Sequence, residues 1–295
     1  MWTSILAEPV KQERKIKILW RNKKKIFSIS IITLVLFGPL FLLIDNWYAT
    51  TNTTIGTFSN SDQSLQLATF NIHQFWSEQD SSAYLQKFRD LIKSENIDII
   101  GLQEMWQGNA SYIANELNMY YFNTSDSHQD SFYGLALLSK FPILETQTFV
   151  FNSSSANFIR AMIWAKININ NKNISVYVTH LDTPASYFSQ VNQAKKILDV
   201  IDTKADSVLL CDCNAPDTVF LETYRLLTEH FEDSWIASGK KTFEGRTWPS
   251  DNPFLRVDYV WLSNNGWLVQ ENSGKILGSS SYSDHLGVKV TVIKT

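Results

Sequence analysis

Residues 206–217 contain the pattern that most limits what this chain can fold into. Residues 208–210 form a continuous apolar run, typical of a strand buried on both faces, and Pro216 breaks the polar segment that follows. We therefore expect a core strand whose carboxyl end carries Asp212 and Asn214, the edge at which open sheets place their chemistry. Because residues two apart in a strand point to the same side, these two side chains should face one pocket. Taken alone, an Asx turn that closes a strand explains the pattern equally well.

The same kind of polar ending recurs at other predicted strand ends. The residues at six such ends are Asn71, Glu104, His180, Asp212 with Asn214, Asp258, and Asp284 with His285. A lone asparagine after a strand is usually a turn residue, and a lone glutamate is usually a solvated charge. A series of such ends within one domain predicts a site assembled from strand termini. His73, His128 and His230 have no strand-end acid or amide in register, and we expect them to lie outside the site.

From residue 65 onward, strands and helices are mixed without an internal repeat. Apolar or alternating runs predict strands at 65–72, 97–102, 133–139, 158–169, 174–179, 208–210, 256–262 and 286–293. Helical periodicity predicts helices at 83–93, 187–201 and 219–228. Strands outnumber helices and are partly linked by hairpins, which favours an α/β fold in which sheets pack on each other with helices outside.

The N-terminal part of the chain predicts a membrane anchor. Residues 1–25 are polar and basic, and residues 26–44 form an uncharged run of mostly Ile, Leu, Phe and Val that is long enough to span a bilayer. A cleaved signal peptide has a shorter apolar region and a small-residue cleavage site, whereas Asp45 and Asn46 make a poor one. We therefore expect residues 26–44 to be an uncleaved transmembrane helix.

The distribution of positive charge predicts the orientation of this anchor. Lysine and arginine crowd before the apolar run, and none occurs in residues 45–84. By the positive-inside rule, the tail 1–25 is cytoplasmic and the chain after the span is extracellular or luminal. Residues 45–64 read as a flexible linker, which leaves 65–295 as the domain that carries the polar strand ends. The bilayer, contacted through residues 26–44, is the expected partner, and the sequence identifies no protein partner.

Charge and cysteine content argue against two classes of site. The formal net charge of −3 does not suit strong, non-specific nucleic-acid binding, which usually requires a basic domain. Cys211 and Cys213 are the only cysteines, and one Cys-x-Cys does not supply a structural zinc site. Since their side chains should run parallel in a strand, we expect both to be small buried hydrophobic residues and not a disulfide.

The residue types at the strand ends favour hydrolysis of a phosphorus ester. Oxygen ligands such as Glu104 and Asn71 suit a hard cation, Mg²⁺ or Ca²⁺. Imidazoles can act as a general base or donate to an anionic oxygen, and a carboxylate such as Asp258 can hold one tautomer. Because the set contains no serine or cysteine nucleophile, we expect water to attack directly. No Walker loop or glycine-rich dinucleotide motif competes with this interpretation.

In order and spacing, these motifs resemble the endonuclease/exonuclease/phosphatase superfamily, which includes deoxyribonuclease I, abasic-site endonucleases, neutral sphingomyelinases and inositol phosphatases. The motifs are Ala68-Thr-Phe-Asn71-Ile, Asp98-Ile-Ile-Gly-Leu-Gln-Glu104, Tyr133-Gly-Leu-Ala-Leu-Leu-Ser139, Val178-Thr-His180-Leu, Cys211-Asp212-Cys-Asn214, Arg256-Val-Asp258-Tyr-Val and Ser283-Asp284-His285. The resemblance implies a four-layer α/β sandwich, with two mixed sheets between helices. It also implies one divalent metal at the top, Mg²⁺ or alternatively Mn²⁺ or Ca²⁺.

The resemblance implies a metal site and a general base. Glu104 would be the principal metal ligand, with Asn71 beside it and Asp284 in support. His285, oriented by Asp258, would activate the attacking water.

The resemblance also implies a phosphate-binding side. His180 and Asn214 would hold the scissile phosphate oxygens, together with Arg160, where some members place a phosphate-contacting arginine. Asp212 would position or protonate the leaving oxygen. The sequence departs from the family at Cys211, where glycine is usual, and at Cys213, where an apolar residue is usual.

Hydrolysis of a phosphorus ester is compatible with several substrates, and the motifs do not choose between them. The anchor and the aromatic residues Phe75, Trp76 and Trp106, which follow catalytic strand ends, favour a phospholipid headgroup over nucleic acid, as in a sphingomyelinase. A membrane-tethered endonuclease resembling deoxyribonuclease I is the alternative. A phosphomonoesterase and a catalytically silent binding module are less favoured, the latter because the set of acids and imidazoles is intact.

Overall fold

The computed structural model describes residues 64–73, 81–105, 108–124, 134–151, 160–203, 205–218, 221–264 and 266–295. All of them belong to a unit that spans Thr53–Thr295. The tail 1–25, the span predicted at 26–44 and the linker up to residue 63 lie outside these ranges. Within the described ranges, no helix is both long and apolar enough to cross a bilayer.

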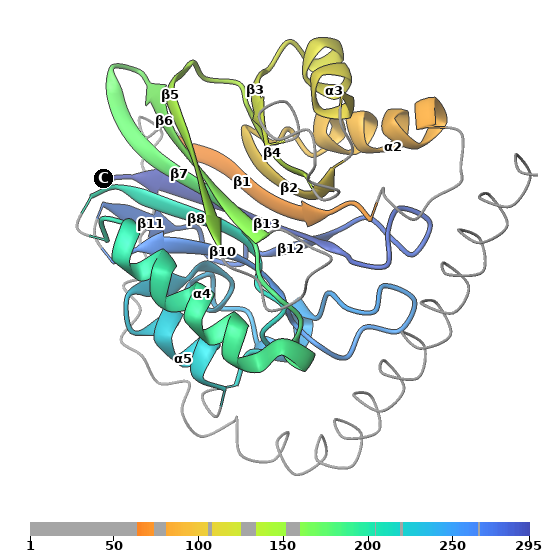
Figure 1. Ribbon diagram of the computed structural model, residues 1–295. Helices are drawn as coiled ribbons and strands as arrows, with labels where there is room; N and C mark the ends of the chain where they lie inside the picture. Colours follow the sequence, from red (N-terminus) through yellow and green to blue (C-terminus); the bar gives the residue numbers. More distant parts are fainter. Residues whose placement is uncertain are drawn as a thin grey trace, which may run out of the picture. The chain divides into compact units, whose positions relative to one another are not determined.

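The first sheet has seven strands and is mixed (Figure 1). The strands run in the order β11, β13, β1, β2, β4 and β3, and β12 pairs with β13. Their bounds are β1 Ser64–Asn71, β2 Ile99–Met105, β3 Tyr120–Asn123, β4 Gly134–Ser139, β11 Trp267–Val269, β12 Lys275–Leu277 and β13 Gly287–Lys294. Strands β1 and β2 are parallel, and β13 is antiparallel to β1. The carboxyl ends of β1 and β2 therefore share an edge with the amino end of β13.

The second sheet has six strands, in the order β5, β6, β7, β8, β10 and β9. Their bounds are β5 Ile143–Phe151, β6 Arg160–Ile169, β7 Lys172–His180, β8 Ser207–Asp212, β9 Phe231–Asp233 and β10 Asp258–Ser263. Strands β7 and β8 are parallel, whereas β6 and β10 are antiparallel to their neighbours. The carboxyl ends of β7 and β8 thus lie beside the amino ends of β6 and β10.

Helices cover the outer face of each sheet. They are α2 Ser81–Ser94, α3 Asn109–Leu117, α4 Tyr187–Val200 and α5 Glu222–Thr228. The short helix α6 Ser234–Ala237 instead contributes Trp235 and Ala237 to the apolar cluster between the sheets, and 3-10 turns occur at η3 Pro184–Ser186 and η4 Thr242–Gly245. In α2, Tyr84, Phe88 and Ile92 repeat every four residues and are buried, so one stripe of the helix packs on the sheet. Figure 1 shows α2 and α3 on one side of the two sheets and α4 and α5 on the other.

Three apolar clusters fill the spaces between these layers. The central cluster joins Leu67 and Ile99 of the first sheet to Val176 and Leu210 of the second. One outer cluster packs α2 and α3 on the first sheet, and the other packs α4 and α5 on the second. The predicted α/β sandwich of two mixed sheets flanked by helices is confirmed. Each of the eight predicted strands and three predicted helices has a counterpart within a few residues of its expected bounds.

Candidate active site

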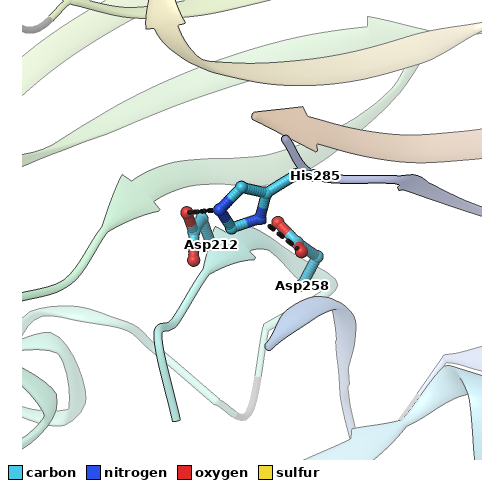
Figure 2. Close-up of side chains that lie close together, drawn as sticks. All are labelled: Asp212, Asp258 and His285. Carbon is cyan, nitrogen blue, oxygen red and sulfur yellow. Dashed lines mark hydrogen bonds and ion pairs between the residues drawn. The ribbon is translucent and has the colours of Figure 1, made fainter. Parts of the chain in front are cut away.

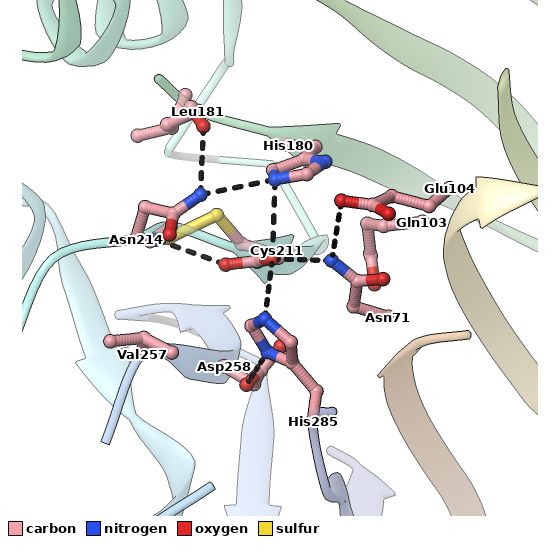
Figure 3. Close-up of polar contacts among 12 residues, drawn as sticks. Asn71, Gln103, Glu104, His180, Leu181, Cys211, Asn214, Val257, Asp258 and His285 are labelled. Carbon is pink, nitrogen blue, oxygen red and sulfur yellow. Dashed lines mark hydrogen bonds and ion pairs between the residues drawn. A yellow bond between two sulfur atoms is a disulfide. The ribbon is translucent and has the colours of Figure 1, made fainter. Parts of the chain in front are cut away.

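Six strand ends meet at one edge of the sandwich. Sheet topology brings together Asn71 at the end of β1, Glu104 in β2, His180 and Asp212 at the ends of β7 and β8, Asp258 at the start of β10, and Asp284 and His285 just before β13. Asn71 Nδ2 donates to Asp212 Oδ2 at 2.8 Å and so links the two sheets. Figure 3 shows polar contacts of Asn71, Glu104, His180, Asn214, Asp258 and His285.

His285 lies between two buried carboxylates (Figure 2). Its Nδ1 is 2.9 Å from Asp258 Oδ2, and its Nε2 is 3.7 Å from Asp212 Oδ2. The three residues are 6%, 1% and 0% exposed respectively, so solvent screens their charges weakly. The hydrogen bond to Asp258 fixes the ring orientation and selects the tautomer.

Opposing charges set the protonation of this group. Burial alone would lower the pKa of His285, but the carboxylates of Asp258 and then Asp212 reverse that effect and hold the pKa well above its usual range. Burial raises the pKa of Asp212 to about 7, although the charge of His285 opposes the shift. In the metal-free protein the imidazole is therefore a cation at neutral pH.

Replacing Asp258 by asparagine is expected to lower the pKa of His285 in the metal-free protein, because the carboxylate that stabilises the imidazolium is removed. A group whose pKa is raised by folding adds stability below its unfolded pKa, about 6.5 for histidine, and loses it as the pH rises through the folded value. Wild type should therefore be more stable than Asp258→Asn at pH values below about 6.5, and this advantage should shrink as the pH rises through the pKa of His285 in the folded protein. An NMR titration of the His285 ring measures the shift, and Asp206→Asn, at the far end of β8, is the control. An unchanged His285 pKa in Asp258→Asn would contradict the assignment.

His180 and Asn214 form the second polar group of the site. His180 Nε2 lies 3.0 Å from Asn214 Nδ2 and 3.2 Å from Asp212 Oδ2. Asn214 takes a positive φ of 47°, which turns the chain after β8, and its Nδ2 also donates to Leu181 O at 3.0 Å. Burial, aided by the charges of Arg160 and His285, lowers the pKa of His180 well below its usual range. His180 is therefore a neutral imidazole, and within the described ranges its buried Nδ1 has no hydrogen-bond partner.

Glu104 lies at an irregularity of β2. The register of β2 against β4 shifts between Gln103 and Met105, and Glu104 takes a positive φ of 56°. Such bulges redirect a side chain, and strained backbone of this kind clusters at functional sites. Asn71 Nδ2 lies 3.3 Å from Glu104 Oε1. Burial raises the pKa of Glu104, and Asp284 adds to the shift against the opposing charge of His73.

Asp284 lies at the rim of the site beside a histidine that the sequence pattern did not select. Its Oδ1 is 3.2 Å from His73 Nδ1, and the two side chains are 44% and 32% exposed. The backbone N–H of His73 donates to Asn71 Oδ1 at 3.0 Å. His73 thus belongs to the site, contrary to our expectation. Strand alternation could not have found it, because β1 ends at Asn71 and His73 takes a positive φ of 47°.

Arg160 also reaches this edge. Its Nε donates to Asp182 Oδ1 at 3.2 Å, and both side chains are buried. Its charge lowers the pKa of both His180 and Glu104, which places the guanidinium near both halves of the site.

The expectation for the two cysteines was wrong, since the structure joins Cys211 and Cys213 in a disulfide. We had assumed an extended strand, in which two residues span about 6.6 Å. Strand β8 ends at Asp212, and the chain contracts there, leaving the two Cα atoms 5.1 Å apart. Both cysteines are fully buried, as expected.

Two separate sets of residues could hold a cation. Within the described ranges, ligand atoms of Asp212, Asp258 and His285 lie within 4.8 Å of one another. The other set is the predicted one, Glu104 with Asn71 and Asp284. In the described part of the chain, Glu104 Oε2 is buried without a hydrogen-bond partner, and so is Asp258 Oδ1. A buried carboxylate oxygen without a donor is costly, and a bound cation would satisfy it. The residues therefore fit a divalent metal.

Asn71 faces these acids with its amide nitrogen, because that nitrogen donates to Glu104 and Asp212. Its Oδ1 accepts from the His73 backbone. Asn71 thus orients the two carboxylates, and direct ligation by its oxygen would require the amide to turn over.

Comparisons with known proteins agree with this arrangement. The family model described as "Endonuclease/Exonuclease/phosphatase family" matches residues 68–285. No curated protein matches the chain in sequence.

Solved structures share the fold. A family protein from Bacteroides thetaiotaomicron has a TM-score of 0.65 and 16% identity, and the similarity covers 79% of this chain and 99% of that one. D. rerio TDP2, complexed with a single-strand DNA product, has a TM-score of 0.65 and 16% identity over 78% and 99% of the two chains. A mannosyl-6-phosphatase from B. thetaiotaomicron has a TM-score of 0.61 and 16% identity over 77% and 99%. At such identities the likeness shows a common fold alone.

The family match spans most of the chain and contains every strand-end residue of the site. Members of the family are phosphoester hydrolases that depend on divalent metals. The chain belongs to the endonuclease/exonuclease/phosphatase family.

Proposed function

We propose that this protein is a membrane-anchored, Mg²⁺-dependent phosphodiesterase that hydrolyses the phosphodiester of a phospholipid headgroup by direct attack of water. The observation that carries the reaction class is a continuous chain of contacts. It runs from Asp258 through His285 and Asp212 to Asn71 and Glu104. It puts a proton acceptor, a proton donor and a cation ligand in one buried site.

His285 acts as the general base in this proposal. Asp258 holds the ring through Nδ1, which leaves Nε2 free to take a proton from water on the side of Asp212. A bound divalent cation would oppose the imidazolium and so would lower the pKa of His285, which favours the neutral ring that a base requires. Asp258 then stabilises the imidazolium that forms.

Asp212 serves the leaving oxygen. Its pKa of about 7 allows it to carry a proton at neutral pH, and Asn71 and the Asn214 backbone N–H fix its two oxygens. His180, neutral and with an unpartnered Nδ1, offers a donor to the phosphate oxygens. Asn214 holds that ring in place, because its Nδ2 donates to His180 Nε2 and to Leu181 O. Arg160 supplies positive charge on the same side.

Glu104 is the principal ligand of the metal, with Asp284 and Asn71 in support. We prefer this set to Asp212, Asp258 and His285 because it leaves His285, oriented by Asp258, to act as the base. When bound, the cation supplies Lewis-acid stabilisation of charge on the phosphate.

An aromatic loop beside the site favours a lipid over a nucleic acid. Trp248 and Phe254 pack with ring centroids 5.9 Å apart, and Phe254 is 40% exposed. Ser250, between them, donates its backbone N–H to Asp284 O at 2.8 Å. Phe188, in the first turn of α4 after the strand that ends in His180, is 82% exposed. Aromatic side chains exposed in this way suit the interface of a bilayer.

The full-length chain, reconstituted in vesicles with Mg²⁺, is expected to hydrolyse sphingomyelin or another phospholipid faster than DNA or a phosphomonoester. A panel of sphingomyelin, phosphatidylinositol, single- and double-stranded DNA and a sugar phosphate measures this preference, and chelation with EDTA should abolish all turnover. Turnover of DNA alone would overturn the lipid assignment, and full turnover in chelator would overturn the mechanism.

A tethered nuclease is the second candidate, favoured by the fold shared with TDP2 in complex with single-strand DNA. It predicts cleavage that falls steeply with salt, because phosphate contacts release counterions.

A further inference from the structure

Two buried glutamines on α4 face the loops of the site. Gln190 and Gln193 are 2% and 1% exposed and lie one turn apart on the same side of the helix. A buried carboxamide is stable only where its donors and acceptor are satisfied. The hydrogen-bond partners of both glutamines therefore identify the loops that α4 holds in place.

Gln190 connects three segments. Its Nε2 donates to Asp182 O at 2.7 Å and to Asn214 O at 2.9 Å, with Cys213 O at 3.3 Å as a third, weaker acceptor. Its Oε1 accepts from Thr223 Oγ1, on α5, at 3.0 Å. One side chain thus joins the loop after β7 and the turn after β8 to the helical layer.

Gln193 acts on the neighbouring residue of the same loop. Its Oε1 accepts from the Asp182 backbone N–H at 2.8 Å, and its Nε2 donates to Asp182 Oδ2 at 3.0 Å. Ser189 Oγ donates to the same oxygen at 2.6 Å, while Arg160 donates to Asp182 Oδ1. The orientation of Arg160 is therefore set through Asp182.

We propose that Gln190 is a positioning residue for the phosphate-binding half of the site, which consists of His180, Asn214 and Arg160. It does not position the metal half, which consists of Glu104, Asn71 and Asp284. The inference rests on the proposed phosphoester chemistry. Asn214 stands in a left-handed turn, and Gln190 holds the carbonyl of that residue and, more weakly, the one before it. The turn determines where the Asn214 amide meets His180. The described hydrogen bonds of Gln190 go to these loops and to α5, whereas Glu104 and Asn71 belong to the other sheet.

The test separates the two halves of the site. In Gln190→Met, the carbonyl oxygens of Asp182 and Asn214 lose their donor. An unsatisfied buried group costs about 1–3 kcal/mol, which corresponds to a loss of roughly 5- to 150-fold in affinity. We expect that loss in the affinity for inorganic phosphate, measured by calorimetry on the Mg²⁺-loaded full-length protein, and in kcat/KM. The affinity for Mn²⁺, measured by electron paramagnetic resonance, should change less than about twofold, since the free-energy change there is close to zero.

Two further variants complete the experiment. Thr223→Val removes the hydrogen bond that the side-chain oxygen of Gln190 accepts from α5. It should weaken phosphate binding by a smaller factor than Gln190→Met does. Ser263→Ala removes a buried hydrogen bond to the Ser207 N–H at the opposite end of β8 and β10, and should leave phosphate affinity unchanged.

Each outcome has one meaning. Unchanged phosphate affinity in both Gln190→Met and Thr223→Val overturns the positioning role. Parallel losses of phosphate affinity, Mn²⁺ affinity and thermal stability overturn it as well, because they would show that the substitution destabilises the whole domain. A wild-type protein that binds no phosphate and hydrolyses no phosphoester overturns the proposed function instead.

Discussion

The His285→Ala variant is expected to lose about 10³-fold in kcat, within the range of 10² to 10⁴ that a general base contributes. The physical reason is the position of the ring, which Asp258 orients through Nδ1 while Nε2 points toward Asp212. No other described imidazole at the site combines an oriented ring with a carboxylate on each side. Steady-state hydrolysis of the best substrate of the panel measures the loss.

Two measurements keep this result from being mistaken for unfolding. The variant should retain the Mn²⁺ affinity of wild type, because its metal ligands remain in place. His230→Ala, an exposed histidine outside the site, should change kcat less than about twofold, as surface substitutions usually do. A His285→Ala enzyme with more than a tenth of wild-type kcat would refute the general-base role.

The core strands could be predicted because their residues carry the pattern of burial. Residues 208–210 are apolar on both faces, and the structure buries all of β8. The edge strands could not be found in this way. Strand β5 is mostly exposed, and its Glu145, Thr146 and Gln147 show no alternation of apolar and polar residues. It is a strand because it pairs with β6 along its whole length, and such a partner cannot be read from local sequence.

The meeting of polar strand ends at one edge of the sandwich could be predicted from the sequence. Polar residues at strand ends are visible as interruptions of apolar runs, and the parallel pairs β1 with β2 and β7 with β8 bring those ends to one edge. Contacts that depend on the turn after each strand were missed. The disulfide between Cys211 and Cys213 forms where extended geometry has ended, and His73, which contacts Asp284, itself takes a positive φ. Turn geometry of this kind is set by neighbouring strands. The membrane anchor at 26–44 stays a prediction.

The Glu104→Gln variant is expected to lose divalent-metal binding and about 10³-fold or more of the activity that the metal supports. Glutamine keeps the shape and the acceptor oxygen that Asn71 contacts, while it removes the charge and replaces the second oxygen by an amide nitrogen. Burial raises the pKa of Glu104, which means that an ionised carboxylate is unfavourable there until a cation neutralises it. The metal-free variant should therefore be at least as stable as metal-free wild type.

Adding metal should then make wild type more stable than Glu104→Gln. At a metal concentration 100 times Kd, wild type gains about 2.7 kcal/mol from binding, and Glu104→Gln gains none. Thermal unfolding with and without Mg²⁺ measures the crossing, and Mn²⁺ titration by electron paramagnetic resonance confirms its cause. Glu95→Gln is the matched control, because that carboxylate pairs with Lys275 and Lys289 before β2 begins, away from the site. It should lower stability and leave the response to metal intact. If Glu104→Gln were stabilised by Mg²⁺ as strongly as wild type, the cation would have to lie on Asp212, Asp258 and His285, and the general base would have to be sought elsewhere.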